Sequence, residues 1–356
     1  MTWAIAKLGS IASMKYGKLP PTGEEGEYPI FTGYRVSGFC KDYLYDEPRV
    51  VVVARGVGGT GDVKMSPEKC WITNLSIVLD VDNDTVDKRF LYYRLGIEPL
   101  KDKLNTGAAQ AQITIENLQS YEISIPRVEI QRDISKLLVA YDDLIENNRR
   151  RMELLEESAR LLYREWFVRL RFPGHEHTRI VDGIPDGWER IPLEHALVLQ
   201  RGFDLPTQNR NEGAVPIYGS TGIVGYHDKP KVIAPGVVTG RSGTLGEVHF
   251  VAEDYWPLNT SLWVKEFKRV TPLFALFLLQ AMDLRQFNGG VSVPTLDRKT
   301  AHRAEILLPA PTLLFEFTEF ASDAFAQIRN LTRQNQKLRV ARDLLLPRLM
   351  NGEISV

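Results

Sequence analysis

The sequence of 356 residues contains little cysteine and no long apolar segment. Its two cysteines, Cys40 and Cys70, lie far apart and form no CxxC pair, which argues against a disulfide framework or a cysteine zinc site. Thiols this sparse suit a reducing compartment, and the N-terminus shows no signal-peptide pattern. The apolar run from Leu273 to Met282 is much shorter than the ~18 residues that a membrane span needs. We therefore expect a cytoplasmic protein without a membrane partner.

An excess of charge of one sign is also missing. The chain has 44 Lys and Arg residues against 45 Asp and Glu residues, which leaves a formal net charge of −1. This balance excludes a uniformly basic chain and an acidic disordered one. It does not exclude nucleic-acid binding, because a local basic patch is sufficient for that.

The common catalytic motifs are missing as well. The sequence has no GxxxxGK[ST] motif and neither Asp-Pro-Pro-Tyr nor Asn-Pro-Pro-Tyr, so it predicts no P-loop ATPase and no adenine-methylating active site. We interpret His175-Glu176-His177 as a solvated linker, and Asp80 to Asp84 lacks the glycine and the closing glutamate of a calcium loop. We expect no catalytic residue, no metal site and no cofactor bound by this chain.

One motif suggests an enzyme of another class. Residues Gly56 to Gly61 match GxGxxG, and Asp80 follows about twenty residues later, which is the outline of a nicotinamide-dinucleotide site. Such a site needs a helix directly after the glycines to hold the pyrophosphate. The segment Asp62 to Pro67 predicts no helix, so we favour a Gly-rich turn after a strand.

The strongest positive feature is an internal duplication. A colinear series of residues recurs at an offset that drifts only between 183 and 187, which chance does not produce. In this alignment Arg55 falls on Arg241. Its further pairs are Trp3 with Trp188, Pro29-Ile30-Phe31 with Pro216-Ile217-Tyr218, Gly61-Asp62-Val63 with Gly246-Glu247-Val248, Trp71 with Trp256, Asn74 with Asn259, and Ile125-Pro126 with Leu308-Pro309.

Each copy has a globular part and a helical part. The globular parts, residues 1–126 and 172–310, combine short β-branched runs with one short helical stretch each, Val86–Leu95 and Leu273–Met282, so the fold class is α+β. The helical parts are 127–171 and 311–356. A duplicated chain favours a pseudo-twofold arrangement, in which the two long helices lie antiparallel.

Both helical parts carry a heptad seam of 33 residues, about 50 Å long at about 1.5 Å per residue. Pro173-Gly174 is expected to end the first helix and Asn351-Gly352 the second. The first seam is Ile134, Leu138, Tyr141, Ile145, Asn148, Met152, Leu155, Ala159, Leu162 and Trp166. Adding 183 gives Phe317, Ala321, Ala324, Ile328, Leu331, Asn335, Leu338, Arg342, Leu345 and Leu349.

Two asparagines interrupt the seams at related places. Asn148 stands two residues before the midpoint of its seam, and Asn335 stands two residues after the midpoint of the other. In an antiparallel pair with aligned midpoints they face each other. A paired buried asparagine fixes helix register, so we predict contact between Asn148 and Asn335. The alternative is that both reach solvent at a loose seam.

Two similar modules on two long helices indicate a bivalent reader, which suits DNA because half-sites are spaced along its axis. Arg55 and Arg241 are the first candidates for contacting DNA, because arginine pairs bidentately with guanine. Polar residues near predicted loops are further candidates. They are Lys15, Lys18, Arg35, Gln110 and Gln112 in the first module and Arg201, Ser220, Thr221, Ser242 and Ser292 in the second.

The whole chain resembles the specificity subunits of type I restriction–modification systems. The resemblance rests on Leu161-Leu162-Tyr163-Arg164-Glu165-Trp166-Phe167, on Ile184-Pro185-Asp186-Gly187-Trp188, on Arg241 to Gly246 and, most specifically, on Arg342 to Ile354. Such subunits alternate two target recognition domains with two helical regions. The resemblance implies that residues 1–126 and 172–310 are target recognition domains, each reading one half of a split site in double-stranded DNA.

The resemblance also implies the partners. The paired helices would set the unread spacer and dock two methyltransferase subunits, which use S-adenosylmethionine. A restriction and translocase subunit that uses ATP with Mg would join them. The modules differ in detail, because the turn Arg55 to Gly61 is one residue longer than Arg241 to Gly246, and the segment Asn105 to Gln112 has no close copy around Asn288. We therefore expect different half-sites.

Three alternatives remain open. The chain could serve another methyltransferase system that lacks the motor nuclease, which the neighbouring genes would decide. It could be a nicotinamide-dependent enzyme that uses Gly56–Gly61, which cofactor binding would reveal. It could be a coiled-coil adaptor without a DNA role, which a DNA-binding assay would exclude.

Overall fold

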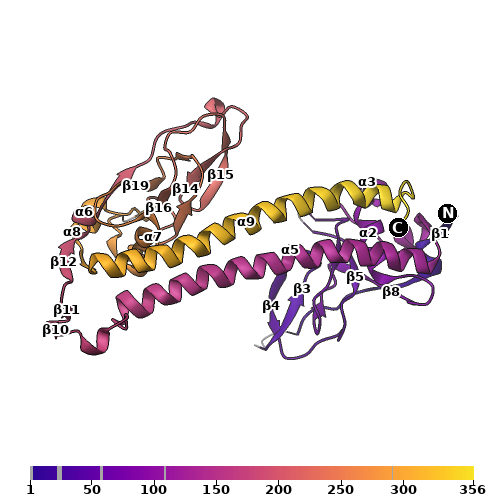
Figure 1. Ribbon diagram of the computed structural model, residues 1–356. Helices are drawn as coiled ribbons and strands as arrows, with labels where there is room; N and C mark the ends of the chain where they lie inside the picture. The colour runs from indigo at the N-terminus through magenta and orange to yellow at the C-terminus, as the bar shows by residue number, and fades with distance from the viewer. Residues whose placement is uncertain (1–2, 22–25, 57–58, 108–109, 291) are drawn as a thin grey trace. The chain divides into compact units, whose positions relative to one another are not determined.

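The computed structural model describes residues 3–21, 26–56, 59–107, 110–290 and 292–356. The chain divides into two compact units. The first unit comprises Met1–Asn148 and Arg333–Val356, and the second comprises Arg149–Thr332. Each unit contains one globular module together with part of each long helix, α5 (Val128–Tyr163) and α9 (Pro311–Met350) (Figure 1).

The first module is built from small sheets. One sheet has the order β2 (Ala12–Tyr16), β8 (Ser76–Val81), β5 (Val50–Val53), β6 (Val63–Met65), and another has β4 (Val36–Cys40), β3 (Tyr28–Phe31), β7 (Trp71–Ile72). Strand β1 (Ala4–Lys7) pairs with β9 (Glu122–Ile125). The short helices are α1 (Leu8–Ile11), α2 (Lys88–Gly96), α3 (Leu100–Leu104) and α4 (Ile115–Ser120).

The second module repeats these strand orders. They are β13 (Leu197–Arg201), β19 (Ser261–Phe267), β16 (Gly236–Gly240), β17 (Val248–Val251), then β15 (Gly222–His227), β14 (Val215–Gly219), β18 (Trp256–Pro257), and β12 (Glu189–Pro192) with β20 (Glu305–Leu308). Its helices are α6 (Leu193–Ala196), α7 (Pro272–Ala281) and α8 (Arg298–Arg303), and β10 (Ile180–Val181) pairs with β11 (Ile184–Pro185). The shared order confirms the duplicated α+β fold.

The long helices are antiparallel within each unit. In the first unit Asp142 of α5 contacts Arg342 of α9, and Asn148 contacts Asn335. In the second unit Met152 contacts Thr332, and the ring of Tyr163 packs on Phe317. Every residue of the two predicted seams is buried or half-buried, which confirms the heptad pattern.

The end of the first long helix differs from the expectation. Regular α-helix ends at Tyr163 and continues as a π-helical segment, Arg164–Val168. The helix ends before Pro173 because Leu170 adopts a left-handed φ of 58°, which turns the chain. Phe172 is then buried against Trp188. The second helix ends at Met350, directly before Asn351-Gly352 as predicted.

Each unit has its own apolar core. In the first, Phe90 and Tyr93 of α2 pack with Ile134 and Leu138 of α5 and with Leu349 of α9. In the second, an aromatic cluster performs this role, and its members are Tyr163, Phe167, Phe274, Phe277 and Phe317. Among the described residues, no helix is long and apolar enough to cross a membrane.

Candidate nucleic-acid interface

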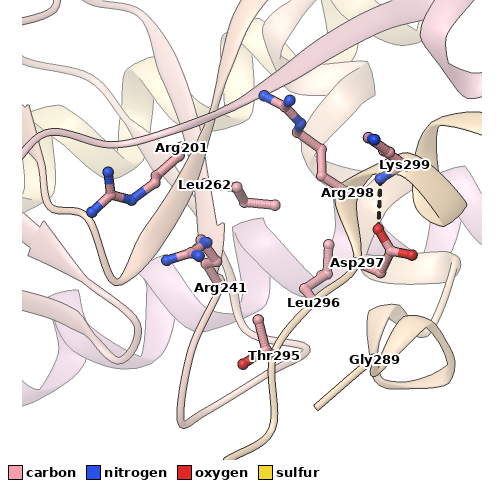
Figure 2. A pocket seen from close by; sticks show the side chains of 9 residues that line it. All are labelled: Arg201, Arg241, Leu262, Gly289, Thr295, Leu296, Asp297, Arg298 and Lys299. Carbon is pink, nitrogen blue, oxygen red and sulfur yellow. Dashed lines mark hydrogen bonds between the residues drawn. The ribbon is translucent and has the colours of Figure 1, made fainter.

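The second module has an open pocket of about 450 Å³ that is rich in positive charge. Arg201, at the end of β13, and Arg241, directly after β16, line one side (Figure 2). Arg298 and Lys299, the first residues of α8, lie across Leu262 and Leu296 from them. We call this site the cationic pocket; it is lined by Arg201, Arg241, Leu262, Gly289, Thr295, Leu296, Asp297, Arg298 and Lys299.

Hydrogen bonds position the two arginines that end the strands. Nη1 of Arg241 donates to the carbonyl of Asn259 at 3.0 Å. Nη2 of Arg201 donates to Oδ1 of Asp204 at 3.1 Å, and the side chain of Asn259 donates to that same oxygen. The two arginines therefore belong to one network, in which each keeps further N–H groups for a ligand, since a guanidinium has five donors.

The single carboxylate that lines the cationic pocket has a structural role. Asp297 is the N-cap of α8, and Oδ1 accepts from the backbone N–H of Lys299 at 2.9 Å. The hydroxyl of Thr300, followed by that backbone N–H, holds the pKa of Asp297 below its usual range. Against this carboxylate stand four cationic side chains, so the lining is positively charged and suits a polyanion.

Backbone hydrogen bonds show that Arg241 and Arg55 are not equivalent, which corrects the sequence alignment. Leu296 N–H donates to the carbonyl of Arg241, whereas the matching Ile113 N–H donates to Ala54, both at 2.8 Å. Arg55 instead corresponds to Ser242. A one-residue shift moves a strand side chain to the opposite face, so the two arginines occupy different sites.

The cause of this error is the loop that follows. It runs from Arg55 to Gly61 in the first module and from Ser242 to Gly246 in the second, so it is seven residues long against five. The first-module loop is therefore two residues longer than its counterpart, not one. Both extra residues follow Arg55 in the chain. Aligning Arg55 with Arg241 by identity wrongly placed one of them before Arg55.

The loop around Asn288 provides a second correction. Oδ1 of Asn288 accepts from the backbone N–H groups of Gly290 and Thr295. Oδ1 of Asn105 accepts in the same way from Gly107 and Gln112. The first-module segment therefore does have a copy here, which was missed because the shared feature is one asparagine that bonds the backbone, while the other side chains differ.

Among the described residues of the first module, the cationic pocket has no positively charged counterpart. Strand pairing places Tyr16 at the position of Arg201 and Ala54 at that of Arg241. The caps Thr114 and Asp297 align α4 with α8, so Ile115 and Glu116 stand where Arg298 and Lys299 stand. The equivalent positions thus carry no cation and one carboxylate.

The two seam asparagines are in contact. Nδ2 of Asn148 donates to Oδ1 of Asn335 at 3.0 Å, and Nδ2 of Asn335 donates to the carbonyl of Ile145, also at 3.0 Å. Both side chains are buried. A slip of one helix along the other would leave both amides unpaired. Each buried amide without a partner costs about 1–3 kcal/mol, so this contact favours one register of the two helices.

Several known proteins are similar to this chain in sequence. Residues 1–157 match the family described as "Type I restriction modification DNA specificity domain". The chain is 23% identical over 352 residues to the type I restriction enzyme MjaIX specificity subunit of Methanocaldococcus jannaschii, covering 89% of this chain and 80% of that protein. It is 30% identical over 175 residues to the putative MjaX specificity subunit of the same organism, covering 44% of this chain and 41% of that protein.

A solved structure shows the same fold. It is the S subunit of a type I restriction–modification system from M. genitalium, with a TM-score of 0.66 and 20% identity. The match covers 98% of this chain and 96% of that one. The family match over residues 1–157 and these relatives indicate a DNA-specificity subunit of a type I restriction–modification system.

In this specificity subunit, the candidate residues of the first module do not form one cluster. Arg55 is exposed and pairs through its backbone with Gln112. Lys15 lies over the ring of Tyr45 at 5.4 Å, and Arg35 lies over Tyr34 at 5.6 Å. Lys18 and Gln110 are exposed. The structure therefore joins only Arg55 and Gln112.

In the second module the structure joins Arg201 with Arg241 in the cationic pocket. Ser242 pairs with Thr295, which also lines that pocket. Ser220 and Thr221 form the turn between β14 and β15, and Ser292 is an exposed loop residue; none of the three lines the pocket. The roles of all these residues in binding DNA stay predictions.

Sequence reasoning missed Arg298 and Lys299. A signal was present, because Asp297 begins a short helix and is followed directly by two cations. It was not recognised because these residues lie about a hundred positions after Arg201. The expectation that no helix directly follows the glycine motif is confirmed, because β6 (Val63–Met65), a strand, follows Gly61; Val57 and Gly58 of the motif lie outside the described residues. The described residues contain no group of three potential metal ligands.

Proposed function

We propose that the two modules, residues 1–126 and 172–310, each read one half of a split site in double-stranded DNA. The observation that carries this proposal is the shared strand order combined with different chemistry at matching positions. A common backbone presents each module to DNA in the same way, while different side chains select different bases. An asymmetric site follows from that difference.

The cationic pocket is the proposed contact of the second module. Arg241 is half-buried and fixed by the carbonyl of Asn259, which favours reading a guanine edge with its remaining donors. Arg298 and Lys299 are exposed and suit phosphate contacts, which add affinity without sequence preference. Arg201 joins the same network through Asp204.

The helical parts, 127–171 and 311–356, are the proposed ruler and docking surface. The contact between Asn148 and Asn335 supports a fixed register, and a fixed register holds the spacer between half-sites constant. We further propose that these helices dock two methyltransferase subunits that use S-adenosylmethionine, and that a restriction and translocase subunit using ATP with Mg joins the complex in the cytoplasm. The specificity subunit then needs no catalytic residue or cofactor of its own.

The half-site proposal is tested by mapping methylated adenines in DNA modified by the assembled complex. Arg241→Ala is expected to relax base preference in one half-site and to leave the other unchanged, at a cost of about 1–3 kcal/mol in binding. Arg298→Ala and Lys299→Ala are expected to weaken binding to all sequences, and each should lower the salt slope by about 1.

Arg269→Ala is the matched control, because Arg269 lies in the same module but pairs with Glu189 and does not line the cationic pocket. Unchanged methylation and affinity in Arg241→Ala would refute the assigned arginine role. A complex that methylates without any sequence preference in either half would refute the half-site proposal.

The ruler is tested by inserting seven residues into each long helix near the seam midpoints, residues 150 and 333. One heptad keeps the seam in phase and adds about 10 Å, close to the length of three base pairs at about 3.4 Å each. The recognised spacer is expected to change while both half-sites stay the same. Unaltered spacing in the methylation map would refute the ruler.

A further inference from the structure

The second unit has another pocket, of about 580 Å³, between the end of α5 and the module elements β17 and α7. This volume lies in the usual range for small-molecule sites, about 300–1,000 Å³. Tyr163, Val168 and Phe277 provide apolar surface, and Arg164, Gln280 and His249 provide polar groups. We call it the helix-end pocket. Its lining is separate from that of the cationic pocket.

Three polar groups of the helix-end pocket have no hydrogen-bond partner among the described residues. Tyr163 is only 5% exposed, and no described residue bonds its hydroxyl. Burial raises the pKa of Tyr163, so the hydroxyl stays a neutral donor. Oε1 of Gln280 and Nε2 of His249 are buried and have no hydrogen-bond partner, and Nε2 of His249 lies 3.6 Å from Oε2 of Glu247. Buried polar atoms in native proteins nearly always have a partner, so the atoms of Gln280 and His249 indicate one that binds from outside the chain, and the hydroxyl of Tyr163 is free to bond it.

The unpaired atoms define what the partner offers. The amide of Gln280 is oriented by its Nε2, which donates to the carbonyl of Val248 at 3.3 Å. Its Oε1 is therefore an acceptor that requires a donor. Tyr163 supplies a donor that requires an acceptor. The rings of Tyr163 and Phe277 lie 6.0 Å apart at an interplanar angle of 28°, and they provide aromatic surface for a planar group.

Charged side chains of both signs line the helix-end pocket, namely Arg160, Arg164 and Glu247. Arg160 is paired with Glu156 and Glu157 of its own helix. Arg164 is exposed and makes no ion pair with any described residue. Arg164 and Val168, the first and last residues of the π-helical segment, both line the helix-end pocket. Such segments occur frequently at functional sites, and this one supplies two of the residues that line the pocket.

We propose that the helix-end pocket binds a small organic ligand that has a planar ring, one hydrogen-bond donor and an anionic group. The ring packs against Tyr163 and Phe277, and the donor bonds Oε1 of Gln280. The anionic group accepts from Arg164 and from the hydroxyl of Tyr163. The ligand would join α5 to the second module, since its contacts come from both.

The first unit lacks the same chemistry. The positions that correspond to Tyr163, Arg164 and Gln280 are Leu346, Pro347 and Gly96. These residues offer no side-chain hydrogen-bond donor or acceptor. The proposed ligand therefore acts on one unit of the specificity subunit only, and a binding stoichiometry of one per chain is expected.

The test uses the full chain and 4-aminobenzoate as the probe, measured by isothermal titration calorimetry. The probe combines a ring, a donor and a carboxylate. Benzoate lacks the donor and aniline lacks the charge, so each is expected to bind roughly tenfold more weakly. Binding of one probe per chain, with both analogues weaker, supports the proposal. Equal binding of all three, or no saturable binding at millimolar concentrations, overturns it.

Variants locate the probe. Gln280→Leu and Arg164→Gln are each expected to weaken binding of 4-aminobenzoate roughly tenfold, because each removes one polar contact. Tyr163→Phe keeps the ring and removes only the hydroxyl. Arg269→Gln, at a residue that lines neither pocket, is the matched control and should leave the affinity for the probe unchanged. If Tyr163→Phe disturbs folding, the exposed Arg164 still decides the result, and unchanged binding in Arg164→Gln and Gln280→Leu contradicts the proposal.

Discussion

At the end of β16 the second module carries Arg241, whereas the matching strand of the first module, β5, is followed by Ala54. Ala54 is fully buried in the apolar core, and Arg241 lines the cationic pocket. The same backbone therefore supports a core contact in one copy and a charged surface in the other. The comparison teaches that duplication preserved strand pairing while the chemistry at the strand ends diverged.

The same contrast recurs where each module meets the long helices. In the first unit Tyr93 donates to Asp142 at 2.5 Å, and Arg342 binds the same carboxylate. The corresponding residues of the second unit are Phe277, Phe325 and the fully buried Ala159. The rings of Phe277 and Phe325 lie 6.1 Å apart. A polar cluster thus holds one module, and an aromatic contact holds the other.

The largest expected effect is on the free energy of unfolding, and its dependence on salt distinguishes the aromatic contact from the polar cluster. Phe325→Ala removes a half-buried ring and is expected to cost about 2–3 kcal/mol, with little dependence on salt. Asp142→Ala removes an acceptor from Tyr93 and Arg342 and is expected to cost about 1–2 kcal/mol, less at high salt because the pair is partly exposed. Denaturant unfolding at low and high salt measures both. Equal salt dependence of the two variants would contradict the comparison.

Acid is expected to affect the two modules in different pH ranges. Burial lowers the pKa of His302 in the second module, and its Nε2 accepts from the backbone N–H of Leu199 at 2.9 Å. The neutral form is favoured in the folded state, so this stabilisation is present above pH ~6.5 and is lost as the pH falls below that value.

Protonation of Glu98 is expected to weaken the first module at a lower pH. Burial alone would raise the pKa of Glu98, but hydrogen bonds from Lys103, Tyr121 and Arg94 outweigh it and lower the pKa to about 2. The stabilisation that this lowered pKa provides is complete above pH ~4.3 and is lost as the pH falls toward 2. Hydrogen exchange at pH 7, 5.5 and 4 should show the second module weakening first.

The control for both losses of stability is to replace each residue by the one at the matching position of the other module. His302 corresponds to Gln119, and Glu98 corresponds to Met282. His302→Gln should remove the loss of stability below pH ~6.5, and Glu98→Met should remove the loss of stability below pH ~4.3. If either variant still loses stability in the same pH range as the unmodified chain, a different group must titrate in that range.

The smallest expected effect tests a feature that the two units share. In each, a hydroxyl of a long helix bonds the N-cap of the module helix: Ser135 donates to Asp87, and Thr318 bonds Thr271 at 3.0 Å. Ser135→Ala and Thr318→Ala are each expected to cost about 0.5–1.5 kcal/mol. Similar losses by thermal unfolding support the equivalence of the two attachments, and a loss in only one unit would break it.

The helical seams could be predicted well because their signal is local. A heptad pattern needs only residue type and spacing along one helix. The asparagine contact followed from the midpoints of the two seams together with antiparallel packing. The end of the first long helix was predicted several residues too far along the chain. The turn is made by Leu170 in a left-handed conformation, and a leucine does not signal a turn in the sequence as glycine or proline does.

The candidate site was predicted only in part. Arg201 and Arg241 were both selected, and they do meet. Arg298 and Lys299 were missed because a pocket gathers residues from strand ends and helix starts that are distant in sequence. The pairing of Arg55 with Arg241 was wrong because identity of residue type carries no information on strand register.

The sequence by itself determined the duplication, the α+β class, the antiparallel helices and the absence of the common nucleotide-binding and methylating motifs, since each depends on repeats, spacing or composition. Only the tertiary structure decided which residues face the same pocket. The physical reason is that successive side chains of a strand point to opposite faces. Because the first-module loop is longer by two residues, aligning the two arginines shifts the strand by one residue. That shift exchanges a buried position for an exposed one. Backbone hydrogen bonds to Ala54 and Arg241 settle that register, and they show that the second module carries a cation where the first has an alanine.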